Sequence, residues 1–166
     1  MQVKFARTIL AGAAMAVGFA VATPAVASAQ MGFVVQGNYA DDFEFGVGGG
    51  VTFGLGSLTT NSGIRAEATF DYYFPGDDLT YWEINGNALM DIKSIPSLYV
   101  GAGVNYYSVG IDSDLCGDLC DFAEDSGVGL NLLAGWNFSG SKGPFVQAKF
   151  EVGGGEQLVI SGGIRF

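Results

Sequence analysis

The chain has 166 residues and a net charge of −10, with 17 acidic residues, 7 basic residues and no histidine. This length fits one domain, and the acidic balance disfavours nucleic acid and anionic surfaces as partners. Hydrolase and acyltransferase sites usually need a histidine as base, so the sequence argues against an enzyme, and no cofactor is expected.

Residues 1–29 have the layout of a secretory signal peptide. Lys4 and Arg7 give a positive start, an apolar stretch follows over residues 8–21, Pro24 interrupts it, and Ala-Ser-Ala at 27–29 provides a cleavage site. A permanent membrane helix would need about 20 unbroken apolar residues. The sequence therefore predicts a signal peptide at 1–29 and one exported domain at 30–166.

The rest of the sequence alternates between apolar and polar side chains with a period of two. In residues 64–74, the polar side chains of Arg65, Glu67, Thr69 and Asp71 take turns with apolar ones, which indicates a strand with two different faces. Most of these segments have about 9 to 13 residues, near the length that a tilted strand needs to cross a bilayer. Eight segments follow the pattern: 33–39, 43–53, 64–74, 82–92, 98–107, 128–138, 146–152 and 158–166.

The connections differ between the two ends of the predicted strands. Segments 40–42, 75–80, 109–127 and 153–157 hold nearly all the loop acids, whereas 55–63, 93–97 and 139–143 lie at the opposite end and carry Lys93 and Lys142. Long outer loops, short periplasmic turns and two aromatic girdles are typical of outer-membrane barrels. The predicted girdles contain Tyr39, Phe43, Tyr72, Phe74, Trp82 and Tyr106 at the loop end, and Phe33, Phe53, Trp136, Phe138 and Phe166 at the turn end.

With these features the chain resembles the small single-domain outer-membrane barrels, the OmpA-like and OmpX-like porin-family proteins, over about residues 32–166. The most specific feature is the last strand, with Ile160, Ile164 and a terminal Phe166 on its apolar face. The expected fold is all-β, an eight-stranded antiparallel up-and-down transmembrane β-barrel. The resemblance implies that the barrel assembly machinery reads this last strand as an assembly signal. Outer-membrane lipid is the other expected partner, and we expect a monomer.

The polar face of the strands is expected to fill the barrel, because eight strands enclose a lumen that side chains can occupy. A basic side chain facing lipid at the bilayer midplane costs roughly 2–4 kcal/mol, so the charges must point inward. Buried charges need partners, and we therefore expect Arg65, Lys149 and Arg165 to pair with Glu67, Glu151 and nearby acids. The other predicted inward charges are Glu44, Glu83 and Asp91. The predicted lumen charge network contains Arg65, Glu67, Asp71, Lys149, Glu151 and Arg165. Inward glycines, among them Gly46, Gly48, Gly50, Gly101, Gly103, Gly129 and Gly135, are expected to give space to bulky neighbours such as Tyr99, Tyr107 and Leu133.

The long third outer loop carries two cysteines among several acids. Cys116 and Cys120 are close enough in sequence for a loop disulfide, which an oxidising compartment permits. A soft-metal pair is the alternative, but the neighbourhood offers no two further ligands. The spacing of Asp112, Asp114 and Gly117 only weakly matches a calcium loop, so we predict no defined metal site and only weak binding of divalent cations at the acidic loops.

Three functions are compatible with this pattern. A barrel with a structural or surface-interaction role and a side-chain-filled lumen is favoured, because the lumen of eight strands is narrow. A small pore or a lipid-interacting transporter is the second. A secreted soluble barrel that binds an apolar ligand is the third, and it requires apolar side chains inside and charges outside.

Overall fold

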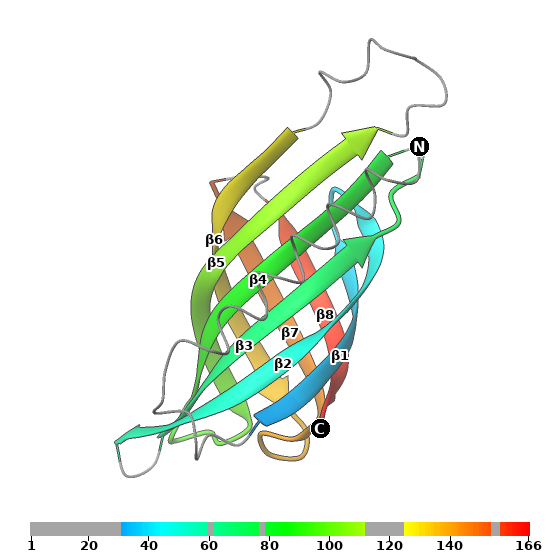
Figure 1. Ribbon diagram of the computed structural model, residues 1–166. Coiled ribbons are helices and arrows are strands. Elements are labelled where there is room, and N and C mark those ends of the chain that lie inside the picture. The colour runs from blue at the N-terminus through cyan, green and yellow to red at the C-terminus, as the bar shows by residue number, and fades with distance from the viewer. Residues whose placement is uncertain (1–30, 60–61, 77–78, 112–124, 154–156) are drawn as a thin grey trace.

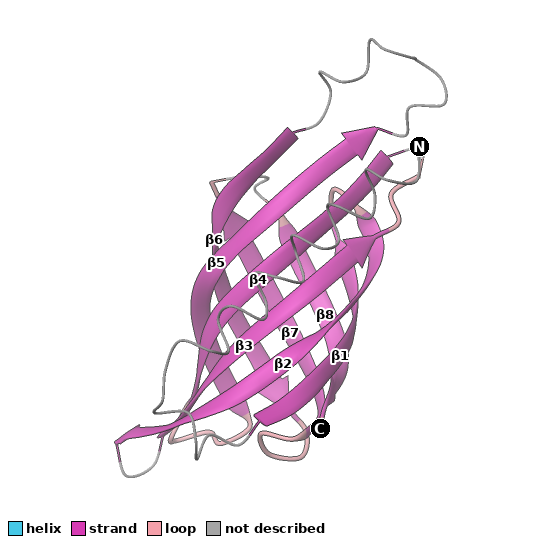
Figure 2. Ribbon diagram, in the orientation of Figure 1, coloured by secondary structure: helices cyan, strands magenta, loops and turns pink. Residues whose placement is uncertain are grey.

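The computed structural model describes residues 31–59, 62–76, 79–111, 125–153 and 157–166. Within these residues the fold is all-β, and no helix long and apolar enough to cross a membrane is present (Figure 2). The eight strands are β1 (Met31–Ala40), β2 (Glu44–Thr59), β3 (Ser62–Tyr73), β4 (Leu79–Asp91), β5 (Leu98–Ile111), β6 (Asp125–Asn137), β7 (Gly143–Val152) and β8 (Leu158–Arg165).

Each strand pairs antiparallel with the next, and β8 pairs with β1 to close the barrel (Figure 1). The predicted eight-stranded antiparallel up-and-down barrel is therefore confirmed. The connections β2–β3, β4–β5 and β6–β7 lie at the end where β1 starts and β8 finishes, which we call the turn end. The opposite end is the loop end.

The observed strands are longer than predicted at two connections. Residues 55–63 are predicted as a turn, but β2 runs to Thr59 and β3 starts at Ser62, with register shifts between Gly54 and Gly56 and between Ser57 and Thr59. Gly56 has a positive φ of 88° at the first shift, a conformation that glycine adopts without strain. At the loop end, β5 runs to Ile111 and β6 starts at Asp125, inside the predicted loop 109–127. In both hairpins the main-chain pairing continues past the point where the alternation of side chains fades.

Side chains alternate between the two sides of the barrel wall. Phe70, Leu132 and Ile160 are 49%, 57% and 43% exposed on the outside, whereas Arg65 and Lys149 are 7% and 4% exposed in the lumen. This is the orientation that the alternation predicts for lipid outside and polar groups inside. A soluble barrel with an apolar cavity needs the reverse arrangement, which the described strands do not have.

Phe43 and Glu44 depart from the predicted alternation. Phe43 was expected in the outer aromatic girdle and Glu44 in the lumen, but Glu44 is exposed and Phe43 is partly buried against the inward cluster of Ala40, Tyr73, Tyr81 and Val159. The cause is the backbone of Glu44, whose φ of 56° lies in the left-handed region and reverses the side on which the preceding residue falls. Phe43 therefore belongs to the lumen and Glu44 to the surface.

Candidate functional site: the filled lumen

The turn half of the lumen is organised around Arg165, the last residue of β8. Its Nε donates to Glu67 Oε2 on β3 at 2.8 Å, and its Nη2 donates to Glu67 Oε1 at 3.3 Å. Its Nη1 donates to Asn137 Oδ1 on β6 at 3.1 Å. The guanidinium carbon also lies over the rings of Phe145 and Tyr99, 3.7 and 5.0 Å from their centroids. One side chain thus connects β8 to β3 through a two-pronged, charge-assisted contact, to β6 through a hydrogen bond, and to β5 and β7 through contacts with aromatic rings.

A second arginine completes the turn half. Arg65 Nη1 on β3 donates to Asp91 Oδ1 on β4 at 2.7 Å, and its guanidinium carbon lies 4.7 Å from the centroid of the Tyr99 ring. The same tyrosine packs with Leu89 and Leu133 in an apolar layer. The described turn half therefore contains two arginines and two acids, paired one to one around Tyr99.

Among the residues that the structure describes, the loop half contains a single basic side chain. Lys149 on β7 forms ion pairs with Glu83 on β4 and with Glu151 two residues along its own strand, the latter at 2.5 Å. Its Nζ also donates to Asn85 Oδ1 at 3.2 Å. The lysine therefore lies between two carboxyl groups, each at most 1% exposed.

Asp71 on β3 is the third buried acid of the loop half, and it has no ion pair among the described residues. Its Oδ1 accepts from Gln36 Nε2 at 2.8 Å and Asn38 Nδ2 at 2.7 Å. Its Oδ2 accepts from Thr69 Oγ1 at 2.8 Å and Asn85 Nδ2 at 2.9 Å. Four neutral donors thus take the place of a cation, which satisfies the oxygen lone pairs of a buried carboxyl group.

An aromatic cluster closes the loop end of the lumen. The Phe43 and Tyr81 rings stack with centroids 3.8 Å apart and an interplanar angle of 2°. Tyr73 and Tyr107 lie beside Tyr81, at centroid distances of 5.2 and 6.3 Å. Gln157 links the cluster to the charges below, because its Nε2 donates to both Tyr81 Oη at 2.9 Å and a Glu151 oxygen at 2.8 Å. We call the four rings the aromatic cap.

Inward glycines make this filling possible. Each lies across from a large inward side chain on the neighbouring strand, as in the pairs Gly48 with Asp71, Gly103 with Asn87, Gly101 with Leu89, Gly127 with Tyr107 and Gly135 with Tyr99. A Cβ on Gly127 would lie 2.6 Å from the hydroxyl oxygen of its tyrosine partner, closer than real Cβ contacts come. The narrow lumen holds its large side chains because glycine backbone lies beneath them.

All six residues of the predicted charge network point into the lumen, but they form two separate groups. Arg165 lies with Glu67, and Lys149 lies with Glu151. Arg65 pairs with Asp91 rather than with Glu67 or Glu151, and Asp71 takes neutral donors. Sequence reasoning missed the roles of Phe43, Tyr81 and Gln157, the last of which was placed in a loop. The inward position of Phe43 depends on the backbone φ angle of Glu44, and no signal in the sequence predicts that angle.

Three predicted features of the sequence lie outside the described residues. These are the signal peptide at 1–29, the disulfide between Cys116 and Cys120, and the weak calcium-like pattern at 112–123. Among the residues that the structure does describe, no cluster of three histidine, cysteine, aspartate or glutamate side chains is arranged to hold a metal ion.

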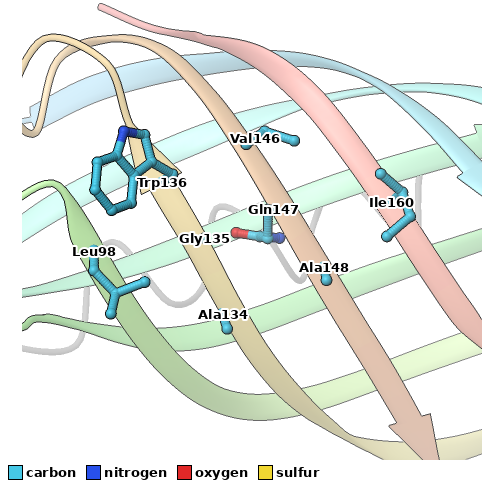
Figure 3. Close-up of a pocket in the computed structure, with 8 residues that line it drawn as sticks. All are labelled: Leu98, Ala134, Gly135, Trp136, Val146, Gln147, Ala148 and Ile160. Carbon is cyan, nitrogen blue, oxygen red and sulfur yellow. The ribbon is translucent and has the colours of Figure 1, made fainter.

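The outer wall is apolar and carries the predicted assembly residues. Ile160, Ile164 and Phe166 face outward on β8 and just beyond it, at 43%, 45% and 59% exposure. Near the turn end, Ala134 and Ala148 leave a shallow hollow between larger side chains (Figure 3). Its lining residues are Leu98, Ala134, Gly135, Trp136, Val146, Gln147, Ala148 and Ile160.

The structure is thus a closed eight-stranded barrel with an apolar exterior and an ionic, side-chain-filled interior. Its fold is that of the small outer-membrane barrels: it is similar to the N-terminal β-barrel domain of Pseudomonas aeruginosa OprF, at a TM-score of 0.53 and 17% identity, over 84% of this chain and 100% of that domain. The Neisserial surface protein A (NspA) gives a TM-score of 0.48 and 15% identity, over 81% of this chain and 94% of NspA. Ail, the attachment invasion locus protein of Yersinia pestis, gives a TM-score of 0.42 and 14% identity, over 83% of this chain and 97% of Ail. No family model matches the chain, and no curated protein matches its sequence.

Proposed function

We propose that the protein is an outer-membrane β-barrel with a structural or surface-interaction role, and not an enzyme. The observation that carries this proposal is the distribution of side chains across the barrel wall. Aromatic and aliphatic side chains are exposed on the outside, whereas eight charged side chains point inward. An apolar belt of this kind is stable against hydrocarbon and unstable in water. The fold shared with the OprF barrel domain supports the same location.

In this proposal residues 1–29 are a cleaved signal peptide and residues 30–166 form the barrel, with the acidic loops on the cell surface. Outer-membrane fractionation of cells that express the full chain, combined with gel migration of heated and unheated samples, tests it. We expect the protein in the outer-membrane fraction, with a mature N-terminus near Gln30 and slower migration after heating. Recovery as a soluble periplasmic protein that needs no detergent would overturn the proposal.

A filled lumen is part of the proposed function, and the small pore is its competitor. The ion pairs of Lys149 and Arg165 and the aromatic cap at Tyr81 occupy the axis at three heights, which supports a plug. Conductance recordings of the purified barrel in planar bilayers decide between the two. The plug predicts no steady ohmic channels, and reproducible channels would establish the pore instead.

The proposed partners are outer-membrane lipid along the wall and the barrel assembly machinery at β8. Phe166 is outward-facing, and its backbone N–H bonds to Phe33 O at 2.9 Å across the closing seam. Phe166→Ala tests the second partner, with Phe138→Ala as a matched control at an equally exposed aromatic of the same end. We expect the first variant to lower the yield of assembled barrel in cells and the second to leave it unchanged. The barrel itself is proposed to be a monomer.

A further inference from the structure

The loop half of the lumen contains more acid than its basic groups can neutralise. Asp71, Glu83 and Glu151 are each at most 1% exposed, and Lys149 is the only cationic side chain near them among the described residues. Burying one carboxylate without a counter-charge is costly, and a group in that position usually becomes neutral instead. The fixed positions of these side chains therefore call for a further positive charge in this half.

The unpartnered polar atoms point to the same need. In the loop half, the buried atoms without a hydrogen bond are mostly acceptors, namely Gln36 Oε1, Asn38 Oδ1, Asn131 Oδ1, Gln157 Oε1 and Glu151 Oε1, together with both polar atoms of Asn105. In the turn half they are donors, namely Arg65 Nε, Arg65 Nη2 and Asn137 Nδ2. Because buried acceptors are normally satisfied, a surplus of them beside three acids indicates a site for a donor that carries positive charge.

The geometry identifies which acid would take that charge. Asp71 accepts four hydrogen bonds from neutral side chains. Glu83 accepts from Tyr73, Tyr81 and Lys149. Glu151 has one neutral donor, Gln157 Nε2, beside its contact with Lys149 Nζ at 2.5 Å, whereas Glu83 has two neutral donors beside the same lysine. Glu151 therefore has the weakest support for a negative charge.

The carboxyl groups of Glu83 and Glu151 lie close together, because each has an oxygen atom in contact with the same Lys149 Nζ. Two carboxylates that lie this close repel each other, whereas a carboxyl group and a carboxylate can share one proton. We propose that Glu151 is protonated in the folded barrel at neutral pH and donates its proton to Glu83, which makes the loop half of the lumen a proton-binding site. The proposal concerns the lumen alone and does not depend on where the barrel resides.

The surroundings of this pair contain few other titratable groups. Asp71 and Tyr73 face it from β3, Tyr81 from β4, Tyr107 from β5 and Lys149 from β7, while the inward side chains of β1, β2, β6 and β8 in this half are uncharged. The described acids at the rim, Asp41, Asp42, Glu44 and Asp125, are exposed. A proton-dependent signal at neutral pH that is lost on substitution of Glu151 is therefore attributable to the pair.

Infrared spectroscopy of the purified barrel, refolded in light or deuterated buffer at pH 7, tests the proposal. A protonated carboxyl group has a carbonyl stretch that is separate from carboxylate bands and shifts on deuteration. We expect this band in the wild-type barrel and its loss in Glu151→Gln. Asp91→Asn is the matched control, because Asp91 is paired one to one with Arg65, and we expect it to keep the band. Gel migration of unheated samples verifies that each variant is folded.

Three outcomes would overturn the proposal. The first is a folded wild-type barrel without the band at pH 7, which needs no variant to be informative. The second is a band that survives in Glu151→Gln, because the proton would then reside on another acid. The third is a band that is absent in sodium or potassium chloride and present in choline chloride, because the site would then hold a monovalent metal ion in place of the proton.

Discussion

In the turn half of the lumen each buried acid has its own arginine, whereas in the loop half three acids surround one lysine. The two halves also differ in the side chains that support the charges. Arg165 is held by a two-pronged carboxylate contact and by two aromatic rings, while Asp71 is held by amides and a hydroxyl group. The turn half is thus a set of closed ion pairs, and the loop half is a hydrogen-bonded network with excess acid.

This difference teaches that a filled lumen can serve two purposes in one barrel. Closed pairs fix geometry, because a planar guanidinium accepts only a narrow range of partner positions. Arg165 applies that constraint at the end of the last strand, where β8 must meet β1 to close the barrel. A network with excess acid can instead gain or lose a proton without breaking the wall. We therefore expect substitutions in the turn half to change stability strongly and comparable ones in the loop half to change it little.

The largest effect is expected for Glu67→Gln. The substitution leaves the Arg165 guanidinium buried without its carboxylate, and breaking a buried pair in this way costs about 3–5 kcal/mol. Urea unfolding of the barrel in lipid vesicles measures the change in the free energy of unfolding. The double variant Glu67→Leu/Arg165→Met removes both charges and should recover most of the loss. A single variant that loses less than about 1 kcal/mol would place the pair among weak surface-like ion pairs.

A smaller loss of stability is expected for Gly135→Ala, because the Tyr99 ring lies over the backbone of this glycine. In Gly135→Ala the new methyl group meets the Tyr99 ring, which cannot move away easily because its hydroxyl donates to Gln147 Oε1 at 2.9 Å and accepts from Arg165 Nη2 at 3.2 Å. Overpacking of this kind costs about 1–3 kcal/mol. Gly86→Ala is the control, because a Cβ there meets no atom within 4 Å on the outer wall. The same unfolding experiment should show no loss for the control, and equal losses in the two variants would refute the packing argument.

The stacking in the aromatic cap is expected to contribute less again. Phe43→Leu keeps an apolar side chain at the mouth but removes the ring that stacks on Tyr81, and such ring pairs contribute about 0.5–1.5 kcal/mol beyond their buried area. Phe33→Leu is the control on the outer wall, because Phe33 points outward and is 57% exposed. If both variants lose equal stability, Phe43 acts as an ordinary wall residue, and the cap has no special role.

The sequence predicted the barrel more completely than it predicted the contents of the barrel. A period of two forces polar side chains to one face of a strand, so the inward direction of Arg65, Asp71 and Lys149 follows from local sequence alone. The partner of each charge depends on the stagger between strands that are far apart in sequence. Arg165 meets Glu67 across 98 residues and across the lumen, and no local rule encodes that meeting.

Backbone exceptions set a second limit on prediction. Phe43 continues the apolar alternation of 43–53 in sequence, and its inward position depends on one left-handed residue, Glu44. Glutamate has no particular preference for that conformation, so composition gives no warning of it. The lumen contacts of Gln157 were not predicted for a similar reason. The strand pattern in the sequence starts at residue 158, whereas the lumen extends one residue further, to Gln157. Such positions become visible only when both sides of a connection are placed in space.

The smallest change in stability at pH 7 is expected for Glu151→Gln, which makes the same chemical change as Glu67→Gln in the opposite half of the lumen. If Glu151 already carries a proton, glutamine replaces a neutral group of equal shape, and the cost is at most that of one neutral hydrogen bond, about 1 kcal/mol.

The pH dependence gives the same comparison a second, independent readout. An unfolded chain releases the Glu151 proton well below neutral pH, so the folded barrel binds more protons than the unfolded chain and its stability falls as the pH rises. For one proton the slope is about 1.4 kcal/mol per pH unit between the pH at which the unfolded chain releases it and the pH at which the folded barrel releases it. Glu151→Gln should remove this slope, whereas Glu67→Gln should lower stability by a similar amount at every pH in that range. Parallel curves for the wild type and Glu151→Gln would show that the two halves of the lumen bury their acids in the same charged state.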